Sequence, residues 1–340
     1  MNRQELESVA QRLVAKGKGI LAADESFGTI KKRFDAVHLE STEETRRSYR
    51  EMLFTTPGSE EFISGVILFD ETIRQKTAEG TPFPDLLSRK GILPGIKVDQ
   101  GTTDLAFFPG EKITEGLDGL RGRLVEYRGL GARFTKWRAV ITIADHLPTR
   151  TCIRANAEAL ARFAALSQEA GLVPIVEPEV LMDGSHDIQR CEEVTEAALK
   201  SVFPELSEHR LILEGMLLKP NMVLPGKKSP RQATVAEVAE ATVRCLRRSV
   251  PASVPGIVFL SGGQTPEQAT RHLNAMNALG NLPWELSFSY GRALQDPTLK
   301  AWKGEAGNVS IAQQRLYHRA KCNGAARFGK YSEEMEAQAP

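Results

Sequence analysis

The sequence predicts a (β/α)8 TIM barrel, and three observations carry the prediction. Short runs rich in valine, isoleucine, leucine and phenylalanine recur along the chain, separated by segments with helical periodicity. Alternating strands and helices favour a parallel sheet, and eight repeats within about 300 residues favour a closed barrel over an open sheet. The sequence contains no glycine-rich dinucleotide fingerprint, which argues against a doubly wound nucleotide-binding domain.

Eight apolar runs are the expected strands, with helices between them. In chain order the runs are Gly19–Asp24, Gly65–Asp70, Gly95–Asp99, Ala132–Val140, Val173–Glu179, Leu213–Pro220, Gly256–Gly263 and Glu285–Gly291. Residues 155–170 carry an alanine and leucine stripe and residues 235–248 carry apolar residues on one face, as amphipathic helices do. No linker or charge block divides the chain, so we expect one domain over residues 1–331. The polar residues 332–340 are expected to form a flexible C-terminal tail.

The composition is that of an ordinary soluble globular protein, with 340 residues, 41% hydrophobic residues and a net charge of +1. Near-neutral charge gives no reason to expect nucleic acid or a membrane surface as partner. The four cysteines are far apart and form no CxxC pair, so neither a disulfide framework nor a cysteine zinc site is suggested. The charged N-terminus and the absence of a long apolar run predict a cytoplasmic protein.

Lys219 is the most informative residue, because it ends the apolar run LEGMLLKP. An ammonium group at the end of an apolar strand is expensive to desolvate, so the neutral, nucleophilic amine becomes more accessible. This is the environment of a lysine that forms Schiff bases. From these eight residues alone, an alternative stays open, in which the lysine only extends its ammonium group into water.

Polar residues stand at the carboxyl end of nearly every expected strand, where barrels carry their chemistry. Residues two apart in a strand share a face. Three charged pairs therefore share a face: Lys97 with Asp99, Lys136 with Arg138, and Glu177 with Glu179. Any one of these charged residues could instead cap a helix, form a structural ion pair or be solvated. The prediction of an active site at the strand ends therefore depends on the repetition of the pattern.

The loops after the seventh and eighth strands are predicted to bind phosphate. Two glycines precede a helix start marked by Thr265, Pro266 and Gln268, and they leave backbone N–H groups free for an anion. A second glycine turn precedes Arg292, whose guanidinium can bind phosphate through two hydrogen bonds. A phosphate site between these two loops recurs in (β/α)8 barrels. The alternative interpretation of the glycines is that they only form tight turns. The predicted members are Ser261, Gly262, Gly263, Ser289, Gly291 and Arg292.

The predicted chemistry is covalent catalysis by a lysine. The sequence has no HExxH, HxH or GxSxG motif, so we expect no catalytic metal, no cofactor and no serine nucleophile. A lysine nucleophile with carboxylates and phosphate pockets suggests a phosphorylated carbonyl substrate handled through an imine. The iminium withdraws electrons from a neighbouring C–C bond, and acid–base groups must then move protons.

Eight segments together resemble class I fructose-1,6-bisphosphate aldolase, in chain order and through almost the whole sequence. They are residues 17–26 (GKGILAADES), 65–72 (GVILFDET), 95–101 (GIKVDQG), 136–138 (KWR), 175–179 (IVEPE), 217–223 (LLKPNMV), 259–264 (FLSGGQ) and 288–295 (FSYGRALQ). The resemblance implies reversible cleavage of fructose 1,6-bisphosphate into dihydroxyacetone phosphate and glyceraldehyde 3-phosphate, in glycolysis or gluconeogenesis. It also implies a cytoplasmic homotetramer that needs no metal.

The resemblance assigns roles residue by residue. Lys219 matches the Schiff-base lysine, Glu177 the carboxylate that shuttles protons, and Glu179 the neighbour that helps to set its charge. Asp24 and Lys136 match residues that assist near the scissile bond. The pocket for the C1 phosphate corresponds to Ser261, Gly262, Gly291 and Arg292, and the region for the C6 phosphate to Lys97, Arg138, Ser26, Thr29, Lys32 and Arg33.

Two alternatives stay open for the sequence. The first is a Schiff-base aldolase that acts on another phosphorylated ketose. The second is a barrel without catalytic activity that binds sugar phosphates, although such a protein has no need to keep both Glu177 and Lys219.

Overall fold

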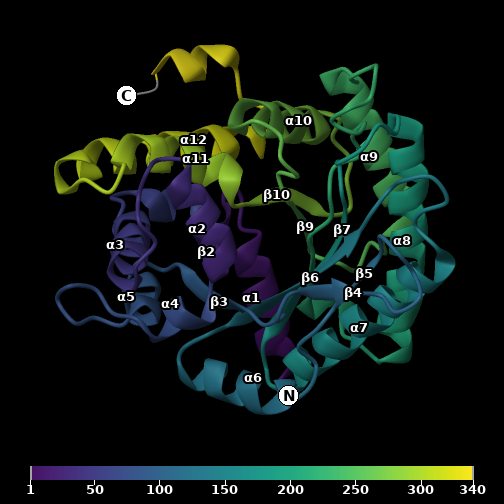
Figure 1. The fold of residues 1–340 in the computed structure, drawn as a ribbon, viewed down its shortest axis with the longest axis horizontal. Helices are drawn as coiled ribbons and strands as arrows, with labels where there is room; N and C mark the ends of the chain where they lie inside the picture. Colours follow the sequence, from purple (N-terminus) through teal and green to yellow (C-terminus); the bar gives the residue numbers. More distant parts are fainter. Residues whose placement is uncertain (1, 339–340) are drawn as a thin grey trace.

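Eight parallel strands close into a barrel in the computed structural model, which describes residues 2–338 (Figure 1). The order around the barrel is β1-β10-β9-β8-β7-β6-β3-β2, and this confirms the predicted (β/α)8 fold. The strands are β1 (Gly19–Ala23), β2 (Ile63–Leu68), β3 (Leu93–Lys97), β6 (Phe134–Ile141), β7 (Val173–Val180), β8 (Leu217–Leu218), β9 (Gly256–Phe259) and β10 (Glu285–Tyr290). Each lies within a predicted run or overlaps it by most of its length.

The interior of the barrel is filled by apolar side chains from the strands. Phe134 on β6 is fully buried there, and it fits because its neighbours Gly65 and Gly95 have no side chains. A Cβ on Gly95 would lie 2.3 Å from the Phe134 ring, closer than any real contact. The helix α1 (Arg3–Leu13) packs Leu6 and Leu13 against the same interior cluster. The mouth at the carboxyl ends of the strands is thereby left for polar side chains.

Helices surround the barrel and pack against its outer face (Figure 1). They are α2 (Phe27–Asp35), α3 (Glu43–Phe54), α4 (Asp70–Arg74), α5 (Phe83–Arg89), α6 (Leu120–Gly129), α7 (Arg150–Glu169), α8 (Ile188–Glu208), α9 (Val235–Ser249), α10 (Pro266–Ala278), α11 (Arg292–Trp302) and α12 (Val309–Ala326). Short 3-10 helices span Ser59–Glu61, Leu213–Gly215, Ala306–Asn308 and Glu333–Gln338. An antiparallel hairpin, β4 (Thr102–Asp104) with β5 (Lys112–Thr114), follows β3 and was not predicted.

The sixth predicted strand is much shorter than expected. Leu213–Gly215 forms a 3-10 helix, and only Leu217 and Leu218 form β8. Gly215 lies against α1, where a Cβ would be 2.9 Å from Leu6, so this part of the run packs beneath the barrel. Lys219 still follows the strand directly, and its backbone N–H donates to the Val176 carbonyl at 2.8 Å.

Residues 332–338 have defined contacts, which the expectation of a flexible tail did not include. Glu336 pairs with Arg319 on α12 and accepts a hydrogen bond from the Tyr331 hydroxyl at 2.7 Å. Glu333 pairs with Arg271 on α10 at 2.9 Å. The segment is therefore joined to two helices by ion pairs, while residues 339 and 340 lie outside the described residues.

None of the helices in the described chain is both long enough and apolar enough to cross a membrane.

Candidate active site

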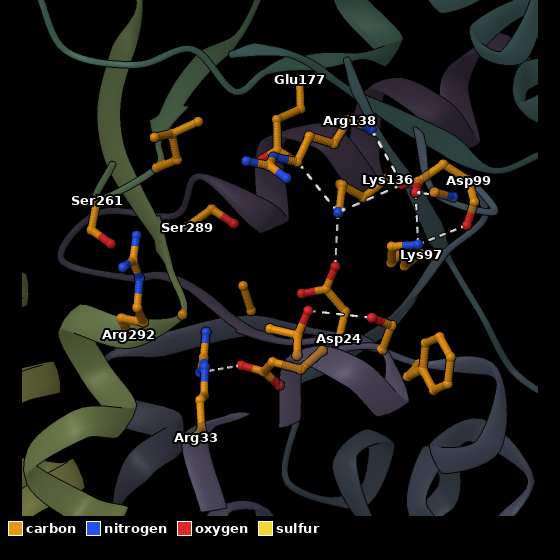
Figure 2. Close-up of a pocket in the computed structure, with 18 of the residues that line it drawn as sticks. Asp24, Arg33, Lys97, Asp99, Lys136, Arg138, Glu177, Ser261, Ser289 and Arg292 are labelled. Carbon is orange, nitrogen blue, oxygen red and sulfur yellow. Dashed lines mark hydrogen bonds and ion pairs between the residues drawn. The ribbon is translucent and has the colours of Figure 1, made fainter. Parts of the chain in front are cut away.

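A cavity of about 1270 Å³ opens at the carboxyl ends of the barrel strands (Figure 2). It collects residues that are far apart in the sequence, since every strand end contributes to the same mouth. All predicted site residues except Gly263 line it: Asp24, Ser26, Thr29, Lys32, Arg33, Lys97, Lys136, Arg138, Glu177, Glu179, Lys219, Ser261, Gly262, Ser289, Gly291 and Arg292.

Lys219 and Glu177 form a buried pair in this cavity. The Nζ of Lys219 lies 3.1 Å from Oε1 of Glu177, and the two side chains are 5% and 4% exposed. Glu177 comes from the middle of β7, and Lys219 follows the neighbouring strand β8. Adjacent parallel strands thus hold an amine and a carboxylate within proton-transfer distance.

Lys136 on β6 lies at the centre of the charges in the mouth, as Figure 2 shows. Its Nζ lies 2.8 Å from Asp24, 3.3 Å from Glu177 and 3.8 Å from Asp99. Burial opposes the charged amine, but the three carboxylates outweigh burial and raise the pKa of Lys136. Burial likewise opposes the charged form of Asp24, and the ammonium groups of Lys136 and Lys219 lower the pKa of this carboxyl. Lys136 therefore stays protonated at neutral pH.

A second set of charges lies at the end of the cavity formed by β3, β6 and α2. The Nζ of Lys97 is 2.6 Å from Asp99, and Arg138 pairs with Glu179. At the start of α2, the Ser26 and Thr29 hydroxyls lie 3.3 Å apart, and Lys32 is exposed one turn further along. The predicted strand-end pairs do point into the mouth together, although each cation already has an acidic partner there.

The predicted phosphate loops lie at the opposite side of the cavity, beside Ser261, Ser289 and Arg292 in Figure 2. Gly262 and Gly263 have φ values of +60° and +86°, which favour glycine and turn the backbone after Ser261. Thr265 caps α10 with Gln268 in a capping box, as predicted. The Ser289 hydroxyl is buried and has no hydrogen-bond partner among residues 2–338. An unpaired buried hydroxyl beside a guanidinium suits an anion.

Arg33 differs from its predicted place. The resemblance groups it with Lys97 and Arg138, but its guanidinium would be 3.5 Å from a Cβ on Gly291. Figure 2 shows Arg33 on the same side of the cavity as Arg292. Arg33 therefore lies with the residues predicted for the C1 phosphate.

Two charged residues that shape the site are absent from the predicted site residues, although Glu25 stands next to Asp24 at the end of the first predicted strand. Glu25 is buried and pairs with Arg33 and with Arg50 of α3, the latter at 2.6 Å. The neighbouring arginines outweigh burial and lower the pKa of Glu25. Arg50 stands among the buried residues Tyr49 and Leu53. An arginine on the apolar face of a helix is rarely buried without a partner, so this pattern could have indicated a buried acidic partner.

The described residues contain one group of three side chains that could hold a metal ion, His318, Cys322 and Glu336. Their ligand atoms lie within 4.8 Å of one another. None of the three lines the mouth of the barrel, and the Glu336 carboxylate is already bound by Arg319 and Tyr331. These residues are therefore separate from the candidate active site.

The fold and the mouth of the barrel define a class: a (β/α)8 enzyme with a buried lysine–glutamate pair at the ends of its strands. A family model described as fructose-bisphosphate aldolase class-I matches residues 5–340. The chain belongs to the class-I fructose-bisphosphate aldolase family.

Relatives of known name agree along nearly the whole chain. A probable fructose-bisphosphate aldolase class 1 from Xanthomonas campestris is 61% identical over 97% of this chain and 99% of the relative. The cytosolic fructose-bisphosphate aldolase 6 from Arabidopsis thaliana is 56% identical over 96% of this chain and 91% of the relative. The solved aldolase from Plasmodium falciparum has a TM-score of 0.96 and 52% identity, over 97% of this chain and 96% of that one. These similarities confirm the predicted activity, metal-independent class I cleavage of fructose 1,6-bisphosphate.

Proposed function

We propose that Lys219 is the residue that forms the Schiff base with fructose 1,6-bisphosphate, and that Glu177 moves the protons. The observation that carries the proposal is the 3.1 Å separation of Lys219 Nζ and Glu177 Oε1 in a buried environment. The amine of Lys219 attacks the C2 carbonyl, and Glu177 delivers a proton to the resulting hydroxyl, which leaves as water. The product is an iminium that bonds C2 to the lysine nitrogen.

Cleavage of the C3–C4 bond follows from the iminium. A base removes the proton of the C4 hydroxyl, the bonding electrons move to C3 and onward to the iminium nitrogen, and glyceraldehyde 3-phosphate departs. The enamine left on Lys219 is protonated at C3, and water then releases dihydroxyacetone phosphate. Asp24 and Lys136 lie beside Glu177 and are proposed to orient the C4 hydroxyl, while Glu179 helps to set the charge on Glu177.

The two ends of the cavity are proposed to bind the two phosphates. For the C1 phosphate we propose the Ser261 turn, the unpartnered Ser289 hydroxyl and Arg292, and we add Arg33 because it lies beside Gly291. The remaining polar residues of the opposite end are proposed for the C6 phosphate: Ser26, Thr29, Lys32, Lys97 and Arg138. Cytosolic relatives support a cytoplasmic location, and we propose a homotetramer, to be tested by light scattering.

Two substitutions test these roles separately. Lys219→Ala is expected to lower kcat by several orders of magnitude, because covalent catalysis itself is lost. Arg292→Ala is expected to raise KM for fructose 1,6-bisphosphate by roughly tenfold or more, with imine formation preserved, because one charge-assisted phosphate contact is removed. Steady-state kinetics of both variants decide the matter. An Arg292→Ala enzyme with unchanged KM and kcat would reject the phosphate assignment.

A further inference from the structure

Two loops at the mouth of the barrel are joined by backbone hydrogen bonds. The loop after β7 and the loop after β8 meet where the N–H groups of Gly226, Lys227 and Lys228 each donate at 2.8 Å. The acceptors are the carbonyls of residues 186, 182 and 184. These three bonds fix the backbone on both sides of Lys227, so the direction in which its side chain leaves the loop is defined.

The side chain of Lys227 reaches the predicted phosphate turn. A Cβ on Gly263 would lie 2.8 Å from the Lys227 Nζ and 3.2 Å from a terminal nitrogen of Arg292. Both cations therefore lie beside the same glycine, immediately after Ser261. A phosphate group has several acceptor oxygens and can be bound by two such cations at once.

The present partner of Lys227 is weak. Its Nζ lies 3.2 Å from Asp183, and the two side chains are 43% and 69% exposed. Ion pairs this exposed contribute little to stability, so exchange of the carboxylate for a phosphate oxygen costs little. A dianionic phosphate held at the same time by Arg292 and backbone N–H groups is the stronger partner.

We propose that Lys227 is a further phosphate-binding residue of this site, a third cation beside Arg292 and Arg33, which leaves Asp183 and contacts the substrate phosphate. The inference rests on the proposed function, namely that the Ser261 turn and Arg292 bind the C1 phosphate. Lys227 lies outside the barrel strands, and its proposed role is in substrate binding and not in bond cleavage.

The test compares Lys227→Met with Lys228→Met, which removes the same charge from the next, exposed residue. The readouts are kcat and KM for fructose 1,6-bisphosphate, and the inhibition constant of inorganic phosphate. We expect Lys227→Met to raise KM and the inhibition constant by roughly tenfold, as for loss of a charge-assisted contact, with kcat nearly unchanged. Lys228→Met should leave all three values close to those of the parent, and Lys227→Arg should restore binding.

A second variant probes the exchange of partners. Asp183→Asn removes the competing carboxylate, so it should lower the phosphate inhibition constant in the parent enzyme and leave it unchanged when Lys227→Met is present. Equal effects of Lys227→Met and Lys228→Met would overturn the inference, since they would report long-range charge only. Arg292→Ala is measured alongside. If Arg292→Ala weakens phosphate binding and Lys227→Met does not, the Lys227 contact is rejected and the proposed phosphate site stands. If neither variant weakens phosphate binding, the proposed phosphate site is rejected as well.

Discussion

Lys136 links the carboxylates of three strand ends into one network. Its contacts with Asp24, Glu177 and Asp99 join the ends of β1, β7 and β3. Buried charges are tolerated only when they are paired, and here the three carboxylates share the ammonium group of Lys136. Because Glu177 contacts both lysines, it can give a proton to a carbinolamine while Lys136 still compensates its negative charge.

The first prediction concerns Glu177. Glu177→Gln keeps the shape of the side chain but cannot carry a proton, so kcat is expected to fall by about 10² to 10⁴, with a small change in KM. The matched control is Glu192→Gln on α8, a buried carboxylate that pairs with Arg244 outside the cavity. Steady-state turnover of fructose 1,6-bisphosphate distinguishes them. Comparable activities in the two variants would mean that Glu177 carries no essential proton.

At the scale of elements, Glu25 connects β1 with α2 and α3. Its carboxylate pairs with Arg33 of one helix and Arg50 of the other, and it accepts a hydrogen bond from Gln295 at 2.8 Å. Arg33 is thereby held at the edge of the cavity, with its guanidinium beside Gly291. The position of one proposed phosphate-binding residue thus depends on an ion-pair network behind it.

The second prediction is a pH-dependent loss of stability in Glu25→Gln. The pKa of Glu25 lies below its ordinary 4.5, so its carboxylate stabilises the fold above that pH and the contribution is lost as pH falls through the folded-state value. At pH 7 we expect a loss of about 3 kcal/mol in unfolding free energy, because two arginines lose their charged partner. Urea unfolding at several pH values should show the difference from the parent shrinking below pH 4.5. Glu44→Gln, an exposed carboxylate paired with Arg47, should change little at either pH; equal stabilities of the parent and Glu25→Gln at pH 7 would contradict the account.

The sequence predicts the strands and most of the mouth because both follow a local rule. Apolar runs mark the barrel strands, and polar residues at their ends, such as Lys136 and Glu177, must meet once the barrel closes. Where a contact depends on another element, the prediction fails. Leu213–Gly215 looked like strand but packs on α1, and Lys227 stands in a polar loop whose position is set by bonds to the loop after β7.

At the scale of the whole molecule, one cavity holds the Lys219–Glu177 pair together with cationic residues at two ends. Figure 2 shows Arg33 and Arg292 at one end and Lys97 at the other, with Arg138 next to Glu177. Each end suits one phosphate, so a substrate with a phosphate at both termini uses the whole cavity. The barrel achieves this arrangement because residues from all of its strand ends are brought to one face.

The third prediction follows from the two ends. The enzyme should prefer fructose 1,6-bisphosphate to fructose 1-phosphate by at least about tenfold in kcat/KM, because the latter loses one set of charge-assisted contacts. Sedoheptulose 1,7-bisphosphate keeps both phosphates but is one carbon longer, and should be intermediate. Turnover of the three substrates under one set of conditions gives the comparison. Absence of any preference for fructose 1,6-bisphosphate would indicate that another ketose is the substrate.

The central claim is that Lys219 forms the covalent intermediate, and borohydride trapping tests it most directly. The intact enzyme is incubated with dihydroxyacetone phosphate, reduced with sodium borohydride and mapped by peptide mass spectrometry. We predict one adduct, on the peptide that contains Lys219, with the same yield in the presence of EDTA and none in Lys219→Ala. An adduct on Lys136 or any other lysine, or no adduct at all, would contradict the account.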